Sequence, residues 1–269
     1  MAATATKFVW ERLRQLNRIP GAYPLYQAVM RAALRDGAVV VIRRGPLRGC
    51  RWRHYRIYQA WMALGMYEPH VAQLIQSELK PGDVFYDVGA NAGYYTLLAG
   101  RIVGPTGRVI AFDPHPRNVS TIQEQIDLNF LADTCHVEAA AVSDRLGAQT
   151  FVLSSTNANS HLAGVDPRSN SDAQEQTVEV TLATLDDCAL RHPRPSLIKI
   201  DVEGAEVLVL HGAKHLLQMS DAPRWLVSTH SADLQRECEA IFRRNSYTFR
   251  HLEGFQQMIY ALPPGLPES

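Results

Sequence analysis

The sequence predicts an α/β fold: a mostly parallel, doubly wound sheet with an antiparallel edge, preceded by an N-terminal extension of helices and a β-hairpin. From residue 84 onward, short apolar runs alternate with segments of helical periodicity, which is typical of parallel βαβ units. Two apolar runs close the chain with no helix between them, and this favours an antiparallel pair at the sheet edge. Residues 1–67 lack the alternation and form the extension.

The length and composition fit this reading. The 269 residues suffice for one sizeable domain with an appendage, and 46% hydrophobic against 20% charged residues is a globular composition. Collagen-like, disordered and coiled-coil classes are thereby excluded. We expect the extension to span residues 1–67, the main domain 68–262 and a frayed tail 263–269.

Turn and helix signals divide the chain into elements. In the extension we expect helices at 8–18, 23–34 and 59–79, and a hairpin of strands 38–44 and 49–55. In the main domain we expect strands at 84–88, 108–113, 135–141, 197–201, 225–230, 247–252 and 257–262, and helices at 94–103, 117–130, 205–218 and 233–244. A smaller antiparallel pair is expected at 151–153 and 178–180, flanking a polar segment, 155–176.

The formal net charge of zero hides a strong asymmetry. Residues 1–67 hold 12 Lys and Arg against two acidic residues, a balance of +10, so the remainder carries −10. Between Arg51 and Trp61 of the extension, arginines interleave with aromatic residues. This pattern could bind nucleic acid, although no RNA-binding module is recognisable. The alternatives are an arm that packs on its own domain, a self-association surface that makes a homo-oligomer, or a port for an acidic or carrier-bound substrate.

Cysteine usage and hydropathy set the expected compartment. The four cysteines are far apart and form no CxxC or Cys/His pair, which argues against a disulfide framework and a structural zinc site. No apolar run approaches the length of a membrane span, and the N-terminus does not resemble a signal peptide. We therefore expect a soluble, cytoplasmic protein.

The end of the first sheet strand carries the most informative motif, Asp87 to Gly93, which reads D-V-G-A-N-A-G. Ligands of open parallel sheets bind beyond the carboxyl ends of strands, and Gly89 would let a ligand approach the backbone while Gly93 begins a helix. The motif is not the G-x-G-x-x-G of dinucleotide binding, and Asp87 would repel a pyrophosphate.

The second strand ends in Asp113, 20 residues after Gly93, where a carboxylate can accept hydrogen bonds from ribose hydroxyls. A nucleoside with a positively charged, non-phosphate tail fits both acids, and S-adenosylmethionine meets that description. The competing interpretation is that the glycines shape a turn and the acids cap helices.

Several segments carry a resemblance: GDVFYDVGANAGYYT, GRVIAFDPHP, AVSD at 141–144, LIKIDVEGAEVLVLHGA at 197–213, GPLRG at 45–49 and LGMYEP at 64–69. Together they resemble the FkbM-type family of S-adenosylmethionine-dependent methyltransferases. The resemblance implies a class I methyltransferase (Rossmann-like) fold with a seven-stranded sheet, and O-methylation of a sugar or other natural product. One departure is Ser228-Thr229-His230, where many relatives have a Glu two residues before the His.

Candidate cofactor-binding residues follow from the motif and the resemblance. The first turn contributes Asp87, Gly89, Ala90, Asn91 and Gly93, and the strand ends contribute Asp113 and Asp201. The resemblance places Ser143 and Asp144 near the adenine, with a simple loop turn as the alternative. Glu68 would bind the amino group of the cofactor if the extension folds over it, and otherwise starts a helix.

Candidate catalytic residues must lie beyond the carboxyl edge of the sheet. Asp201 and Glu203 follow the fourth strand and His230 follows the fifth, so any of them could accept the proton of an attacking hydroxyl. His161 is a weaker candidate in the polar segment 155–176, which we expect to act as a ligand-ordered gate. Lys199 is expected to be a paired core lysine, with Asp201 or Glu206 as its partner.

Three further alternatives stay open. Asp201, Glu203 and His230 could ligate Mg²⁺, which we do not favour because no dedicated acid cluster stands there. An RNA methyltransferase would use the basic extension, and a non-catalytic protein would bind the cofactor or assemble without turnover.

Overall fold

The computed structural model describes residues 34–154, 160–164, 176–252 and 255–266. The chain divides into two compact units, residues 1–69 and 70–269, and each is described by itself. The helices expected at 8–18 and 23–34 lie outside the described residues. Among the helices that are described, none has the length and apolar character that a membrane crossing requires.

The N-terminal unit contains the expected hairpin. Strands β1 (Val39–Val41) and β2 (Arg51–Arg53) pair antiparallel, and helix α3 (Ala60–Ala63) follows. The single helix expected at 59–79 is wrong. Gly65 has a φ of +69° and packs so closely on Arg44 that a Cβ would overlap its carbonyl oxygen, so the chain turns there and resumes as α4 (Pro69–Glu78).

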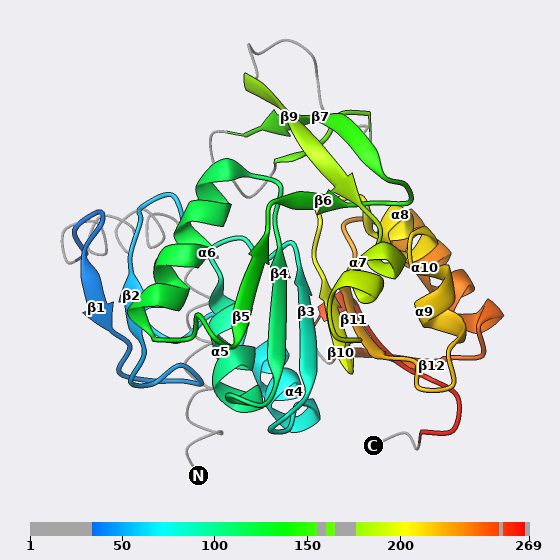
Figure 1. Ribbon diagram of the computed structural model, residues 1–269, viewed down its shortest axis with the longest axis horizontal. Coiled ribbons are helices and arrows are strands. Elements are labelled where there is room, and N and C mark those ends of the chain that lie inside the picture. Colours follow the sequence, from blue (N-terminus) through cyan, green and yellow to red (C-terminus); the bar gives the residue numbers. More distant parts are fainter. Residues whose placement is uncertain (1–33, 155–159, 165–175, 253–254, 267–269) are drawn as a thin grey trace, which may run out of the picture. The chain divides into compact units, whose positions relative to one another are not determined.

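The second unit is built on a seven-stranded sheet with the order β12-β13-β11-β10-β3-β4-β5 (Figure 1). Its strands are β3 (Val84–Val88), β4 (Arg108–Phe112), β5 (Cys135–Glu138), β10 (Leu197–Ile200), β11 (Arg224–Ser228), β12 (Thr248–Leu252) and β13 (Phe255–Leu262). The first five are parallel, and β13 runs antiparallel to both β11 and β12. The strand order reverses between β3 and β10, and open α/β sheets bind ligands at such a point. The predicted fold class is confirmed.

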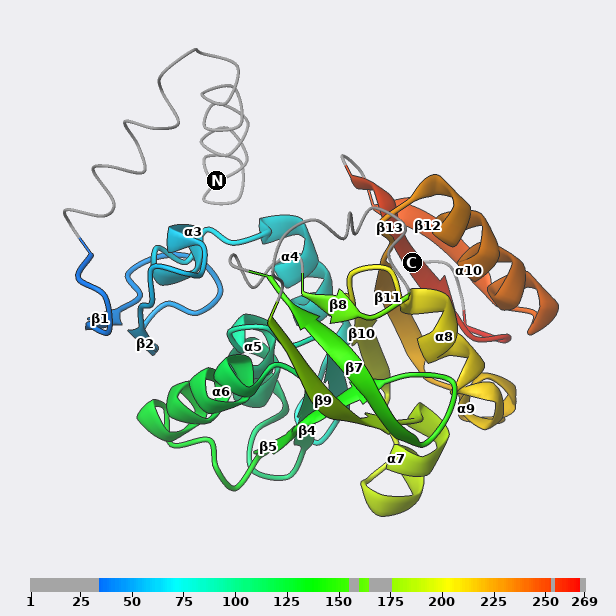
Figure 2. The same ribbon diagram turned by 90° about the horizontal axis from the view of Figure 1, so that it is seen from above.

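Helices cover both faces of this sheet (Figure 2). Helices α5 (Tyr94–Val103) and α6 (Pro116–Leu128) lie on one side, and α7 (Leu185–Arg191), α8 (Glu206–His211), α9 (Lys214–Gln218) and α10 (Ala232–Arg244) lie on the other. Alternate strand residues such as Tyr86, Ile198 and Trp225 form the core beneath α7–α10. Because strand side chains alternate, Asp87 and Lys199 are directed to the opposite face.

Two helix predictions needed correction. The helix expected at 205–218 is broken at Gly212, the C-cap of α8, and resumes as α9. Gly212 lies so close to Ser143 that a Cβ would overlap its carbonyl oxygen. Helix α7 was not predicted. It begins at an N-cap, Thr184, whose side chain accepts a hydrogen bond from the backbone of Asp187, a signal that the sequence did carry.

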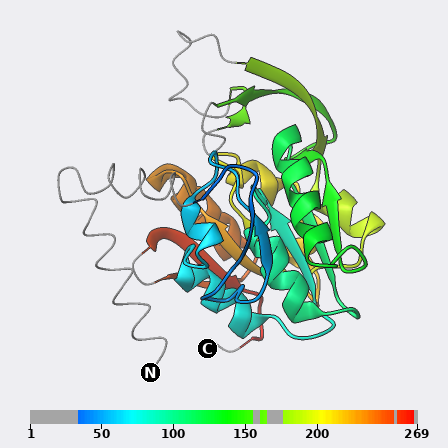
Figure 3. The same cartoon turned by 90° about the vertical axis from the view of Figure 1, so that its left-hand side faces the viewer.

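A four-stranded sheet lies beyond the carboxyl ends of the parallel strands (Figures 1 and 3). It consists of β6 (Ala140–Val142), β7 (Gly147–Leu153), β8 (His161–Leu162) and β9 (Gln176–Ala183) in the order β6-β9-β7-β8. The expected pair at 151–153 and 178–180 is its antiparallel centre. The strand expected at 135–141 splits at residue 139, since β5 stays in the main sheet while β6 joins this one.

His161 was expected in a gating loop but lies in strand β8, where it is buried and paired with Val152. The neighbouring Leu162 packs into an apolar cluster with Phe151, which explains why this part of the polar segment is a strand. Residues 155–159 and 165–175 of the segment lie outside the described residues. All four cysteines are free and buried.

Candidate active site

The turn after β3 is shaped by backbone conformations that favour glycine. Gly89 and Gly93 have φ angles of +77° and +83°, and Asn91 between them has +53°. A Cβ at Gly89 would overlap the carbonyl oxygen of Asp201, which follows β10. The loops that end the two central strands are therefore in backbone contact, and only glycine permits it.

Asp87 is fully buried at the base of this turn. Its Oδ2 accepts a hydrogen bond from the Thr96 hydroxyl at 2.7 Å, and its Oδ1 lies 3.5 Å from Lys199 Nζ. Lys199 stands opposite Asp87 in the parallel register, and its Nζ also lies 3.6 Å from Asp201 Oδ2 and 5.2 Å from the centre of the Tyr95 ring. The prediction of a paired core lysine is confirmed, with Asp87 and Asp201 as its partners.

Asp113 follows β4 and is tied to the same turn. Its Oδ2 accepts a hydrogen bond from the backbone N–H of Asn91 at 2.8 Å, while its Oδ1 accepts from the His115 N–H at 2.9 Å and from Asn118 Nδ2 at 3.0 Å. Burial raises the pKa of Asp113 to about 6, against the lowering effect of those three hydrogen bonds. The carboxylate is thus held rigidly beside the turn.

Asn91 leaves an acceptor open at this place. Its side-chain Oδ1 is buried and has no hydrogen-bond partner among the described residues. A buried polar atom without a partner carries a desolvation cost, and such atoms are typical of a site that a ligand completes. The open acceptor belongs to the residue whose backbone N–H binds Asp113 Oδ2.

Beyond β10 and β11, three carboxylates surround one imidazole. We call Asp201, Glu203, Glu206 and His230 the sheet-end cluster. His230 Nδ1 lies 2.6 Å from Glu206 Oε1, and its Nε2 lies 3.3 Å from Glu203 Oε2 and 3.6 Å from Asp201 Oδ1. Glu206 is fully buried at the start of α8, and its Oε1 also accepts a hydrogen bond from the Gly204 N–H at 3.0 Å.

This environment holds a proton on His230. Burial by itself lowers the pKa of His230, but hydrogen bonds to Glu203 and Glu206 and the charge of Asp201 outweigh burial and raise that pKa to about 10. The ring is consequently an imidazolium at neutral pH. An imidazolium cannot accept a proton, and in this state both ring nitrogens donate toward the surrounding carboxylates.

The two remaining acids differ in their surroundings. Asp201 lies between two cations, Lys199 and His230, both at 3.6 Å. Among the described residues, the cation that Glu203 contacts is His230; the Glu203 side chain is 35% exposed, and its backbone has a φ of +48°. A non-glycine residue held in the left-handed region is strained, and such residues cluster at functional sites. Glu203 is the better placed of the two to accept a proton.

Asp201, Glu203 and His230 also satisfy the geometric condition for a metal site, since their ligand atoms lie within 4.8 Å of one another. Mg²⁺ prefers oxygen ligands, and an imidazolium offers it no lone pair. The donor set at neutral pH is therefore two carboxylates, each already engaged by a cation.

The other predicted residues lie elsewhere. Ser143 and Asp144 follow β6 of the small sheet; Ser143 packs beneath Gly212, and Asp144 pairs with Arg145 at 3.2 Å. Glu68 belongs to the N-terminal unit. Adenine contact by Ser143 and Asp144 and amino-group binding by Glu68 stay predictions.

Sequence reasoning missed three residues of the site: Thr96, Asn118 and Glu206. Thr96 and Asn118 are polar residues that are buried on helices directly after Asp87 and Asp113, a signal that could have found them. Glu206 was considered only as a partner of Lys199, whereas it pairs with His230.

Comparison with known proteins agrees with this architecture. Residues 87–251, from the buried acid of the first turn to the closing strand pair, match the family described as methyltransferase FkbM domain. The chain belongs to the FkbM methyltransferase family. The earlier resemblance is confirmed.

Three relatives illustrate the family. The chain is 27% identical to the hexuronic acid methyltransferase AglP of Haloferax volcanii over 156 residues, 56% of this chain and 58% of that protein. It is 36% identical to the 31-O-demethyl-FK506 methyltransferase FkbM of Streptomyces tacrolimicus over 76 residues, 28% of either chain. The solved structure of a methyltransferase FkbM from Methylobacillus flagellatus KT superposes with a TM-score of 0.47 at 16% identity, covering 76% of this chain and 56% of the other. The chain thus matches less than two thirds of the length of each relative.

Proposed function

We propose that this protein transfers the methyl group of S-adenosylmethionine to a hydroxyl oxygen of a small acceptor, such as a sugar. The observation that carries the proposal is the backbone contact between Gly89 and Asp201, because it sets the sheet-end cluster directly beside the turn that suits a nucleoside cofactor. Membership of the family supports methyl transfer. Two relatives named for a hexuronic acid and for a 31-O position support an oxygen acceptor.

The residues present fit the cofactor. Asp113 and the open Oδ1 of Asn91 would bind the nucleoside, and the glycine backbone at residue 89 would let it approach. Asp87, Asp201, Glu203 and Glu206 outnumber the two cations Lys199 and His230, so the site has an acidic balance that favours a cationic ligand. When bound, S-adenosylmethionine supplies an electrophilic methyl group on a sulfonium.

Glu203 is the residue that would accept the proton of the acceptor hydroxyl. It is the most exposed acid of the sheet-end cluster, and the imidazolium of His230 fixes its orientation at 3.3 Å. General base catalysis of this kind contributes about 10²–10⁴-fold to a rate, and correct orientation of the acceptor oxygen contributes the rest. Asp201, held between Lys199 and His230, would bind and orient the ligands.

The basic extension does not by itself favour an RNA acceptor. Trp52 and Tyr58, two of the aromatic residues that interleave with its arginines, are buried and offer no face on which a base could stack. An acidic or carrier-bound acceptor would be attracted by the positive charge of the extension and would need no aromatic side chain to stack on. Salt-dependent binding of RNA tight enough to compete with a small acceptor would favour the RNA alternative.

Calorimetry with S-adenosylhomocysteine tests the cofactor half of the proposal. Gly89→Ala should weaken binding roughly 10–100-fold, because the new Cβ separates the two loops and a positive φ strains alanine. Gly104→Ala is the matched control: its φ is +64°, yet a Cβ there meets no atom within 4 Å. Equal affinities of the two variants would contradict the proposed site.

Methyl transfer from labelled S-adenosylmethionine to a panel of glycosides, hexuronic acids and hydroxylated natural products tests the other half. We expect label on an acceptor oxygen. A protein that binds the cofactor and labels nothing in such a panel, or labels only nitrogen or carbon, would contradict O-methyl transfer.

A further inference from the structure

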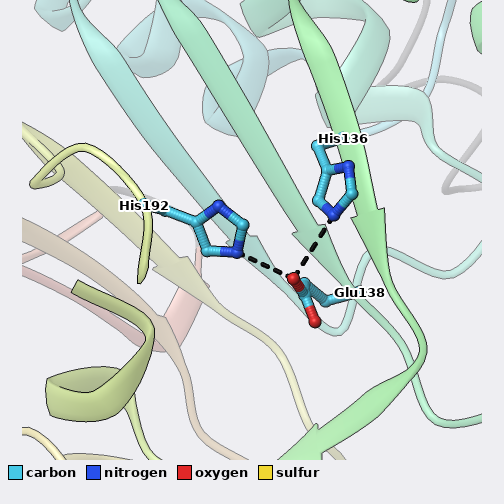
Figure 4. A group of neighbouring side chains, drawn as sticks. All are labelled: His136, Glu138 and His192. Carbon is cyan, nitrogen blue, oxygen red and sulfur yellow. Dashed lines mark hydrogen bonds and ion pairs between the residues drawn. The ribbon is translucent and has the colours of Figure 1, made fainter. Parts of the chain in front are cut away.

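A second group of ligand-forming side chains lies away from the sheet-end cluster, at the edge of the main sheet (Figure 4). It consists of His136 and Glu138 on β5 and His192 at the end of α7, and we call it the edge cluster. His136 and Glu138 are two residues apart and so lie on the same face of β5, which is the last strand of its sheet. His192 is the C-cap residue of α7.

The three side chains converge on one point. Glu138 Oε1 lies 3.3 Å from His136 Nε2 and 2.7 Å from His192 Nε2, and all three ligand atoms lie within 4.8 Å of one another. A tetrahedral zinc ion with bonds of about 2.0–2.1 Å separates its ligand atoms by roughly 3.3 Å. The observed separations can reach that value with small side-chain rotations.

We propose that His136, Glu138 and His192 form a binding site for a divalent transition-metal ion, with Zn²⁺ as the ion that this donor set fits. Two imidazole nitrogens and one carboxylate oxygen are a common zinc ligand set that leaves one position to water. Access from solvent is open, since the His136 side chain is 58% exposed, while Glu138 at 21% and His192 at 16% are partly shielded. The bound ion would link β5 to the segment that leads from α7 into β10.

In the part of the chain that the structure describes, Arg191 is the cation that competes for the site. Its Nη1 lies 3.3 Å from Glu138 Oε1, and its Nε donates to Asp187 Oδ2 at 3.1 Å. When an ion occupies Glu138, Arg191 keeps its bond to Asp187, one turn back on α7. A variant without this cation should therefore bind the ion more tightly.

The site is independent of the proposed methyl transfer, and Zn²⁺ itself is the probe. We expect untagged full-length protein to bind one equivalent of Zn²⁺ at the edge cluster, measured by competition with a chromophoric chelator. The double variant His136→Ala/His192→Ala should lose at least tenfold in affinity at this site. The control His211→Ala/His215→Ala removes two exposed histidines elsewhere and should change the affinity less than twofold.

Two further variants separate the remaining explanations. The ligand atoms of Asp201, Glu203 and His230 also lie within 4.8 Å of one another, so a variant there shows which cluster holds the ion. His230→Asn should leave the zinc equivalent in place, and loss of that equivalent in His230→Asn would overturn the proposal. Arg191→Gln should raise the affinity several-fold, a change that general destabilisation of the protein cannot produce. Absence of stoichiometric binding by the wild-type protein, or unchanged binding by the double variant, would also overturn it.

Discussion

The sheet-end cluster and the edge cluster use the same two kinds of side chain and are suited to different ligands. At the sheet end, three carboxylates surround one partly buried imidazole, and together they keep a proton on it. At the edge, two imidazoles share one carboxylate oxygen near solvent. The two clusters thus differ in the proportion of acid to imidazole: three carboxylates hold a proton on one ring at the sheet end, while two rings and one carboxylate meet at the edge as a ligand set of the kind that binds zinc.

The two clusters should differ most in kcat when one acid in each is neutralised. Glu203→Gln should lower kcat by about 10²–10⁴-fold, because it removes the proposed proton acceptor while the cofactor turn stays intact. Glu138→Gln at the edge should change kcat less than twofold. The kcat of each variant is measured by methyl transfer from labelled cofactor, and calorimetry shows whether cofactor affinity is retained. A normal kcat for Glu203→Gln would contradict the assignment of Glu203 as the proton acceptor.

Because the pKa of His230 is raised, the free energy of unfolding should depend on pH. Its pKa in the folded protein, about 10, lies above the unfolded value of 6.5, so its contribution is complete below pH 6.5 and is lost as the pH rises through 10. The loss should be about 5 kcal/mol in the free energy of unfolding, because the two pKa values differ by about 3.5 and each pKa unit corresponds to about 1.36 kcal/mol. Urea denaturation between pH 6 and about 10.5 should show this slope in the wild type and a flatter curve in His230→Asn. Parallel curves for the two proteins would mean that His230 is not held as an imidazolium.

Cofactor binding should depend on a different titration. The raised pKa of Asp113, about 6, means that its carboxylate is protonated as the pH falls below 6 and then accepts ribose hydrogen bonds poorly. Affinity for S-adenosylhomocysteine should therefore fall by up to about tenfold between pH 7 and 5. In Asp113→Asn the affinity should be low at both pH values, and the exposed Asp133→Asn serves as the control. An equal pH dependence in Asp113→Asn would assign the titration to another group.

The smallest effect on kcat is expected from removal of metal ions, and this treatment tests directly whether either cluster depends on a metal. Removal of divalent ions with EDTA should change kcat less than twofold, because the cation in the sheet-end cluster is an imidazolium. The same treatment should lower the melting temperature of zinc-loaded protein, an effect absent from His136→Ala/His192→Ala. A chelator-sensitive kcat that Mg²⁺ restores would revive the magnesium alternative for Asp201, Glu203 and His230.

Local signals in the sequence were enough to predict the glycine turn after β3 and the buried acids beside it. Asp87, Gly89 and Asp113 are recognisable because a buried strand, a glycine turn and the end of the next strand follow each other within 27 residues. The alternation of strand side chains also predicted that Lys199 would need an acidic partner. These properties depend on short stretches of chain, and the sheet topology then brings the strand ends together.

Contacts between distant segments could not be predicted in this way. His192 and Glu138 are 54 positions apart, and their contact depends on helix α7, which periodicity did not reveal in seven residues. Likewise, the pairing of Glu206 with His230 depends on where α8 begins after a left-handed Glu203 and Gly204. The breaks at Gly65 and Gly212 both fall where a glycine closely approaches another segment, which helical spacing does not report.

The contact between Gly89 and the carbonyl oxygen of Asp201 also constrains which substitutions the two loops tolerate. A substitution that reshapes either loop displaces the other, so under the proposed function a change of acceptor that remodels the loop after β10 would also disturb the cofactor turn. The four-stranded sheet, spliced into the chain between β5 and β10, is tied to the same loop. Its Phe151 and Leu162 form an apolar cluster with Ala205, and Val202 packs against that cluster, so substitutions in the small sheet also reach the loop after β10.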